Sequence, residues 1–344
     1  MPAEVHQGFR VDPADLPAEG VVFGQTAAML EVRDKIECAR KGDFPVLLQG
    51  ESGTGKDLIA RFLHVYSSRS EGPFVKLSCA AVAPGLLEGE LFGYEGKSGA
   101  GDIERGLIEV AEGGTLFLDG IGELSRSFQK KLSHLLKDGH YFRTGGREEQ
   151  QARVRIICAT NVDLGKAIEK GTFRQDLFHH MDVMRLRLSP LRERKEDIPQ
   201  LWDFFAEKLA RKFGKKAPQL TPAVLRVLQQ WNWPGNLCEL ENCIARVIIL
   251  GGEEGIGEEL RRQAAFAGAV DGPQGKSGRS GRRKTASHQV VGEAVILQVL
   301  RANRWSQRKA AGGLKRSYRS LLYRLRNSGA IQRPRSRKGF PRPD

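Results

Sequence analysis

The chain has 344 residues, of which 40% are hydrophobic, so two or three domains with sizeable cores are expected. It contains no run of about 18 apolar residues, which argues against a membrane-spanning helix. The net charge of +14 comes from one end, because residues 276–344 carry 19 Lys and Arg against 2 acidic residues, whereas the rest carries 36 against 39.

This asymmetry predicts a polyanionic partner for the C-terminal end, with a merely solvated basic tail as the alternative. Residues 1–20 lack the basic and apolar regions of a signal peptide and read as a short lead. The five cysteines are scattered without a CxxC pair, so neither a disulfide framework nor a zinc site is supported. We therefore expect a cytoplasmic protein without a membrane partner.

The hydrophobic pattern divides the chain into segments of different character. Over residues 21–190, strand-like apolar runs alternate with helical patterns, which predicts an α/β fold with a mainly parallel sheet. Residues 191–262 are helical throughout and predict a small all-α appendage. Residues 263–290 are rich in Gly, Ser and Arg and read as a flexible linker. Residues 291–333 are helical again, and 334–344 form a basic tail.

The first motif that carries chemistry is a glycine-rich loop between an apolar strand and a helix. Its residues match the pattern GxxxxGK, whose backbone N–H groups cradle phosphates at a helix N-terminus while the lysine reaches the β and γ phosphates. The predicted ATP-binding residues are Gly50, Glu51, Ser52, Gly53, Thr54, Gly55, Lys56 and Asp57. A chance glycine loop is the alternative, but the strand before it and the helix after it favour a phosphate site.

The second motif, GGTLFLDG at 113–120, is a buried strand that ends in Asp119. A carboxylate at the C-terminal end of such a strand, facing a phosphate loop, is expected to hold Mg²⁺ or its water. A helix cap or a turn aspartate is the alternative. Position 57, which usually offers a hydroxyl to the metal, is Asp here, so the magnesium prediction depends mainly on Asp119.

The C-terminal helices carry the pattern expected of a DNA-reading module. Ser306 and Ser317 are predicted to cap the helices on either side of a turn at 312–314, which predicts a helix-turn-helix. A recognition helix in the major groove contacts bases with its N-terminal residues and phosphates with flanking arginines. The predicted DNA-binding residues are Arg316, Ser317, Tyr318, Arg319, Ser320, Tyr323 and Arg324. Packing or capping is equally open for Tyr318 and Ser320.

Several motifs, GESGTGKDLIAR, LLEGELFGYE, GGTLFLDGIGEL, FRQDLF and WPGNLCELEN, stand in one order along the chain. From about Val21 to Ile248 the sequence thereby resembles the AAA+ core of bacterial sigma-54-dependent enhancer-binding transcription activators, and residues 291–330 resemble the Fis-type helix-turn-helix of that family. The resemblance implies an AAA+ P-loop ATPase core with a parallel sheet, a small all-α lid and a C-terminal helix-turn-helix. It also implies rings with ATP between subunits, and hydrolysis that drives a loop against sigma-54.

The same resemblance assigns two further residues. Asn161 in CATN is similar to the sensor of the γ-phosphate, and Arg174 in FRQDL to the arginine finger that reaches a neighbouring subunit's ATP. A strand-end polar residue and a surface charge are the respective alternatives. The implied partners are double-stranded DNA with a palindromic site, RNA polymerase with sigma-54, and further copies of the chain, from a dimer to a ring.

The chain departs from the family pattern at positions that serve hydrolysis. The catalytic glutamate after Asp119 is replaced by Gly120, the asparagine that holds it by Ser78, a second arginine finger by His180, and the lid arginine by Cys238. Glu123 could replace the missing base, but its offset from Asp119 is unfavourable. In addition, the sigma-54-contacting loop Gly-Ala-Phe-Thr-Gly-Ala is replaced by GKSGAGD at 96–102.

The sequence therefore predicts an ATP-binding, sequence-specific DNA-binding transcription regulator with impaired ATP hydrolysis and impaired sigma-54 contact. Two alternatives stay open: a fully active ATPase that remodels sigma-54 RNA polymerase, and a non-hydrolysing subunit of a mixed ring. Whether the chain is an enzyme is left undecided by Gly120.

Overall fold

The computed structural model describes residues 8–96 and 103–250, which all belong to the first of the two units into which the chain divides, Met1–Val270. The predicted linker, helix-turn-helix and basic tail lie outside the described residues, as do all seven predicted DNA-binding residues and most of the 96–102 loop. For these segments the sequence-based expectations stay predictions.

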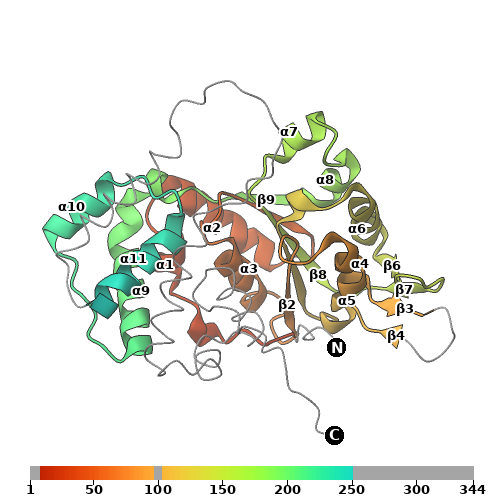
Figure 1. Cartoon of the computed structure of the whole chain (residues 1–344), viewed down its shortest axis with the longest axis horizontal. Helices are drawn as coiled ribbons and strands as arrows, with labels where there is room; N and C mark the ends of the chain where they lie inside the picture. The colour runs from red at the N-terminus through yellow and green to blue at the C-terminus, as the bar shows by residue number, and fades with distance from the viewer. Residues whose placement is uncertain (1–7, 97–102, 251–344) are drawn as a thin grey trace, which may run out of the picture. The chain divides into compact units, whose positions relative to one another are not determined.

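A parallel sheet of five strands organises the α/β part of the chain (Figure 1). Its order is β2-β5-β8-β1-β9, and each neighbouring pair is parallel. The strands are β1 (Val46–Gln49), β2 (Phe74–Ser78), β5 (Thr115–Asp119), β8 (Arg155–Thr160) and β9 (Met184–Arg187). The α/β fold with a parallel sheet is thereby confirmed.

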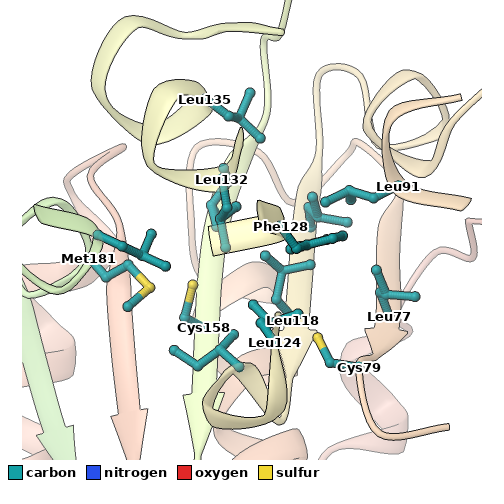
Figure 2. Packing of buried hydrophobic residues seen from close by; sticks show 14 of the residues in the cluster. Leu77, Cys79, Leu91, Leu118, Leu124, Phe128, Leu132, Leu135, Cys158 and Met181 are labelled. Carbon is teal, nitrogen blue, oxygen red and sulfur yellow. The ribbon is translucent and has the colours of Figure 1, made fainter. Parts of the chain in front are cut away.

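Helices cover both faces of this sheet, which explains why its central strands are apolar on both sides. One face packs against α2 (Ala27–Arg40) and α3 (Lys56–Val65). The other packs against α4 (Pro84–Phe92), α5 (Leu107–Val110), α6 (Arg126–Asp138) and α8 (Gln175–Met181). Figure 2 shows Leu118 and Cys158 of the sheet below Phe128 and Leu132 of α6. The core is therefore divided by the sheet into two apolar layers.

Smaller elements complete the α/β part. Two short antiparallel ribbons pair β3 (Tyr94–Glu95) with β4 (Ile103–Glu104) and β6 (His140–Phe142) with β7 (Glu149–Gln151). The remaining short helices are α1 (Glu19–Phe23), α7 (Leu164–Glu169) and the 3-10 turns η1 (Pro13–Asp15), η2 (Ile121–Glu123), η3 (Leu191–Glu193) and η4 (Lys195–Asp197).

Beyond η4, the described chain consists of three helices that share a separate apolar core: α9 (Ile198–Phe213), α10 (Pro222–Gln230) and α11 (Asn236–Leu250). Trp202 and Trp233 are fully buried between them. We call this group the lid helices.

None of the helices in the described ranges combines the length and hydropathy needed to cross a membrane.

Candidate nucleotide-binding site

The predicted phosphate loop joins β1 to α3 at the C-terminal edge of the sheet. Gly53 has φ +78° and Gly55 has φ +101°, a backbone conformation that disfavours side chains. A Cβ at Gly53 would also lie 2.4 Å from the carbonyl oxygen of Gly235, so a side chain there would strike the lid backbone. The loop conformation thus requires glycine for two independent reasons, one local and one tertiary.

Lys56 begins α3 and folds its side chain over the loop. Its Nζ donates to the carbonyl oxygens of Gly50 and Glu51, at 2.8 Å each. Burial lowers the pKa of the Lys56 ammonium, and the negative charge of Asp119 opposes this effect. A partly buried cation held by two loop carbonyls at a helix N-terminus is suited to bind an anion such as a phosphate.

The lid helices hold the outer side of the phosphate loop through Asn236 and Leu237. The buried Asn236 side chain donates to the carbonyl oxygen of Ser52 at 2.9 Å and accepts from the Leu191 N–H at 2.8 Å. The backbone N–H of Leu237 donates to the carbonyl oxygen of Gly53 at 2.9 Å. The loop is therefore fastened to α11 through its own backbone carbonyls.

Two arginines, Arg192 within η3 and Arg194 directly after it, add further bonds to the phosphate loop. Arg192 pairs with the Glu51 carboxylate through two bonds of 2.6 and 2.8 Å, which lowers the pKa of Glu51. Arg194 is buried and donates to the carbonyl oxygen of Thr54 at 2.9 Å, and its burial lowers its pKa to about 10. Sequence reasoning assigned no role to either arginine, since their partners lie some 140 residues earlier in the chain.

The inner side of the loop opens on a cavity of about 600 Å³. Residues of the N-terminal segment, of α3, of the sheet edge and of the lid helices line it. Among the predicted site residues, those that line it are Ser52, Gly53, Gly55, Lys56, Asp57, Asp119 and Asn161. Gly50 and Glu51 line a neighbouring cavity of about 440 Å³, which Asn161 also borders, whereas Thr54 is buried and lines neither of the two.

Asp119 lies at the end of β5, in register with Ser78 of β2. Its Oδ2 is 3.6 Å from the Nζ of Lys76, and the same ammonium donates to Oδ1 of Asp57 at 2.6 Å. Oδ2 of Asp57 pairs with Arg61 at 2.9 Å. Asp57 is therefore engaged through both oxygens, and Asp119 is the carboxylate that remains for a Mg²⁺ ion.

No group of three or more His, Cys, Asp or Glu side chains is arranged for a metal ion within the described ranges. Asp119, the residue that the sequence predicts for Mg²⁺, could hold such an ion, which would take its other oxygen ligands from phosphate and water. The magnesium site stays a prediction.

Gly120 follows Asp119 in a left-handed conformation, with φ 87° and ψ 34°. Its N–H donates to the carbonyl oxygen of Ala159, and its carbonyl accepts from the N–H of Glu123, so the chain turns at once into η2. Glu123 lines the same cavity. The backbone at position 120 is thus set for glycine and presents no general base.

Arg174 lies at the N-cap of α8 and lines neither cavity. Its guanidinium makes bonds of 2.9 and 2.6 Å to Asp176 and thereby lowers the pKa of that carboxyl to about 2. The action of Arg174 on a neighbouring subunit's nucleotide stays a prediction. Cys238, which replaces the lid arginine, lines the larger cavity, and burial raises the pKa of its thiol.

Comparisons with known proteins identify the domains to which these residues belong. Residues 22–187 match the sigma-54 interaction domain, and residues 192–271 match the AAA+ ATPase lid domain. The chain is 40% identical over 309 residues to a Nif-specific regulatory protein of Azotobacter vinelandii, which covers 89% of this chain and 58% of that protein.

A Nif-specific regulatory protein of Rhizobium leguminosarum bv. trifolii is 37% identical, with 90% of this chain and 95% of that protein covered. Among solved structures, NtrX from Brucella abortus in complex with ATP is similar with a TM-score of 0.63 and 30% identity, over 89% of this chain and 68% of that one. The chain spans a little over half the length of the first of these regulators, 58%.

Proposed function

The chain belongs to the sigma-54 activator family and carries its ATP-binding AAA+ domain, and from this premise we propose that it is a sequence-specific DNA-binding transcription regulator that holds ATP but hydrolyses it poorly. The observation that carries the proposal is the contrast within one cavity. Lys56 and the loop glycines Gly53 and Gly55 line it together with Asp119, whereas Gly120 offers no base beside them.

The expected loss of turnover follows from the two groups that are missing. A positioned general base contributes about 10²–10⁴ in rate. An arginine finger contributes about 10³–10⁵, and His180 stands at the second finger position. Together these changes reduce turnover by about a thousandfold or more. Binding is less affected, because the loop amides and Lys56 provide most phosphate contacts.

The DNA-binding part of the proposal is based on the sequence. Residues 276–344 hold 19 basic against 2 acidic side chains, and the 316–324 segment presents arginines at helical spacing. Phosphate contacts from such a segment give strong, salt-dependent affinity for DNA. We expect assembly as a dimer or a ring on a palindromic site, with nucleotide occupancy as its regulator. Contact with sigma-54 RNA polymerase is impaired by the altered 96–102 loop.

One observation favours a second candidate function, a non-hydrolysing subunit of a mixed ring. Arg174 is kept, although the chain lacks a base of its own at Gly120. Such a subunit can supply a finger to the ATP of an intact neighbour while its own ATP stays uncleaved. Mixing the chain with an active homologous activator tests this: subunit exchange that changes the partner's ATPase, and that depends on Arg174, supports it.

The decisive experiment measures ATP binding and phosphate release side by side on the full chain, with Lys56→Met and the exposed Lys130→Met as a matched control. We expect the wild type and Lys130→Met to bind ATP with little turnover, and Lys56→Met to lose binding. Rapid phosphate release that depends on Lys56 would refute the proposal of impaired hydrolysis. Equal binding by all three proteins would refute the assigned site.

A further inference from the structure

Lys76 is a charged residue in an otherwise buried stretch of β2, between Val75 and Leu77. It lies on the same face of the strand as Ser78, since side chains alternate along a strand. The register that pairs Ser78 with Asp119 also pairs Lys76 with Phe117. The strand thus sends one ammonium toward the cluster of charges at the sheet edge.

The ammonium of Lys76 joins two carboxylates that come from different elements. It donates to Oδ1 of Asp57 on α3 at 2.6 Å, and it lies 3.6 Å from Oδ2 of Asp119 on β5. The ring of Phe117 lies 5.5 Å away, so the cation also has an aromatic neighbour. All three charged side chains are about one-third exposed, at 33%, 34% and 33%, so their interactions are only partly screened by water.

The two carboxylates, but not Lys76 itself, line the cavity that also holds Lys56. Two carboxylates facing a triphosphate repel it, and a divalent cation commonly relieves such repulsion by bridging oxygens. In this chain Lys76 and Arg61 already compensate Asp57 through both of its oxygens, and Lys76 faces Asp119 as well. The compensation that a metal would supply is therefore partly built into the protein.

We infer that Lys76 acts as a fixed counter-cation that allows this cavity to bind a nucleoside triphosphate without a divalent metal. The inference rests on the proposed nucleotide site and specifies its metal requirement. Asp119 keeps the capacity to hold Mg²⁺, but binding of the nucleotide does not depend on the ion. A regulator that holds nucleotide without cleaving it needs the metal less than an ATPase does, since Mg²⁺ chiefly stabilises charge that develops during phosphoryl transfer.

The alternative role for Lys76 is an ion pair that serves folding alone. That role predicts a change in thermal stability on substitution but no change in the effect of Mg²⁺ on nucleotide affinity. The ratio of the dissociation constants in EDTA and in Mg²⁺ therefore separates the two roles.

The experiment measures the affinity of the full chain for a fluorescent ATP analogue in excess Mg²⁺ and in EDTA. Four proteins are compared: the wild type, Lys76→Met, Lys76→Arg and Lys131→Met. Lys76→Arg keeps the positive charge. Lys131→Met is the control, because Lys131 pairs with Glu88 away from the cavity. For the wild type, Lys76→Arg and Lys131→Met, we expect dissociation constants that agree within about threefold between the two conditions. Lys76→Met should bind the analogue about tenfold or more weakly than the wild type in EDTA and should regain wild-type affinity in Mg²⁺.

A wild type that binds tightly in Mg²⁺ but loses its affinity in EDTA would overturn the inference and leave the proposed function intact. If Lys76→Met melts cooperatively and its ratio of dissociation constants in EDTA and in Mg²⁺ equals that of the wild type, the inference is also overturned. If Lys76→Met fails to fold, nucleotide binding by Lys76→Arg that requires Mg²⁺ would overturn it instead. Absence of nucleotide binding by folded wild type in both conditions would instead refute the nucleotide site itself, and the inference with it.

Discussion

The replacement of the catalytic base by Gly120 can be tested by restoring a carboxylate at that position. The backbone there has φ 87°, and a non-glycine residue in the left-handed region costs about 1–2 kcal/mol. Space is available, because a Cβ would meet only Ala80, with its nearest atom at 3.8 Å. Gly120→Glu and Gly120→Ala should therefore lower the free energy of unfolding by the same amount, about 1–2 kcal/mol.

The two variants differ in the carboxylate, so their difference in turnover measures the base alone. Ser78 stands beside Asp119 in the sheet register, at the position where the resemblance places an asparagine that holds the base. We therefore compare two double variants that both carry Ser78→Asn. The one with Gly120→Glu should turn over ATP at least about tenfold faster than the one with Gly120→Ala. A fully positioned base sets an upper limit of about 10²–10⁴.

The assay is phosphate release at saturating ATP, with urea denaturation of each variant as the measure of folding. An equal gain from Gly120→Ala would show that the backbone, not the carboxylate, limits turnover. No gain from a folded glutamate variant would show that another missing group, such as the second finger at His180, is limiting. A wild type that already turns over ATP as fast as the restored variant would refute the reasoning from Gly120.

Three further predictions concern the contact between the lid helices and the phosphate loop, acid stability, and DNA binding. Asn236→Ala should lower the free energy of unfolding by about 2–4 kcal/mol, because its buried hydrogen-bond partners are left unpaired. Substitution of the exposed Asn161 by Ala should change it by no more than about 0.5 kcal/mol, and urea titrations measure both variants. Burial lowers the pKa of His64 to about 4, from the ordinary histidine value of 6.5. Below pH 6.5 the unfolded state therefore binds a proton that the folded state does not. The free energy of unfolding should fall by about 2 kcal/mol from pH 7 to pH 5. A His64→Gln protein should lack this component, and equal acid sensitivity of the two proteins would contradict the prediction. Arg319→Ala should weaken binding to the target DNA about tenfold in fluorescence anisotropy without changing ATP affinity, and loss of both would indicate misfolding instead.

The parts of the fold that the sequence predicts are those set by local pattern. The apolar runs at β1, β5 and β8 are buried along nearly their whole length, and β2 is apolar except for Lys76 and Ser78, so composition alone identifies these strands. The edge strand β9 escaped prediction, because in Met184–Arg187 only Leu186 is fully buried and two arginines stand beside it. A half-exposed edge strand lacks the continuous apolar run that marks the others.

The phosphate loop was predictable for the same reason, since its glycines and Lys56 are close in sequence. The partners of that loop were not. Asn236 contacts Ser52 across 184 residues, and Arg194 contacts Thr54 across 140. Likewise, Lys76 is visible in the sequence as a lone charge in a strand, but its two carboxylates are brought to it by α3 and by the sheet register.

These long-range contacts change what the intact phosphate loop can be taken to mean. A side chain at Gly53 would clash with the carbonyl oxygen of Gly235, and the Glu51 carboxylate pairs with Arg192, so the presence of both residues is explained by packing alone, without any ligand. Lys56 differs, because its ammonium bonds only to carbonyls of its own loop among the described residues and costs desolvation to bury. In a purely structural loop only these two hydrogen bonds would offset that cost, whereas a bound triphosphate would also compensate the charge of the ammonium. The nucleotide-binding function therefore depends on Lys56 more than on the glycine pattern, and substitution of this one side chain separates the two explanations.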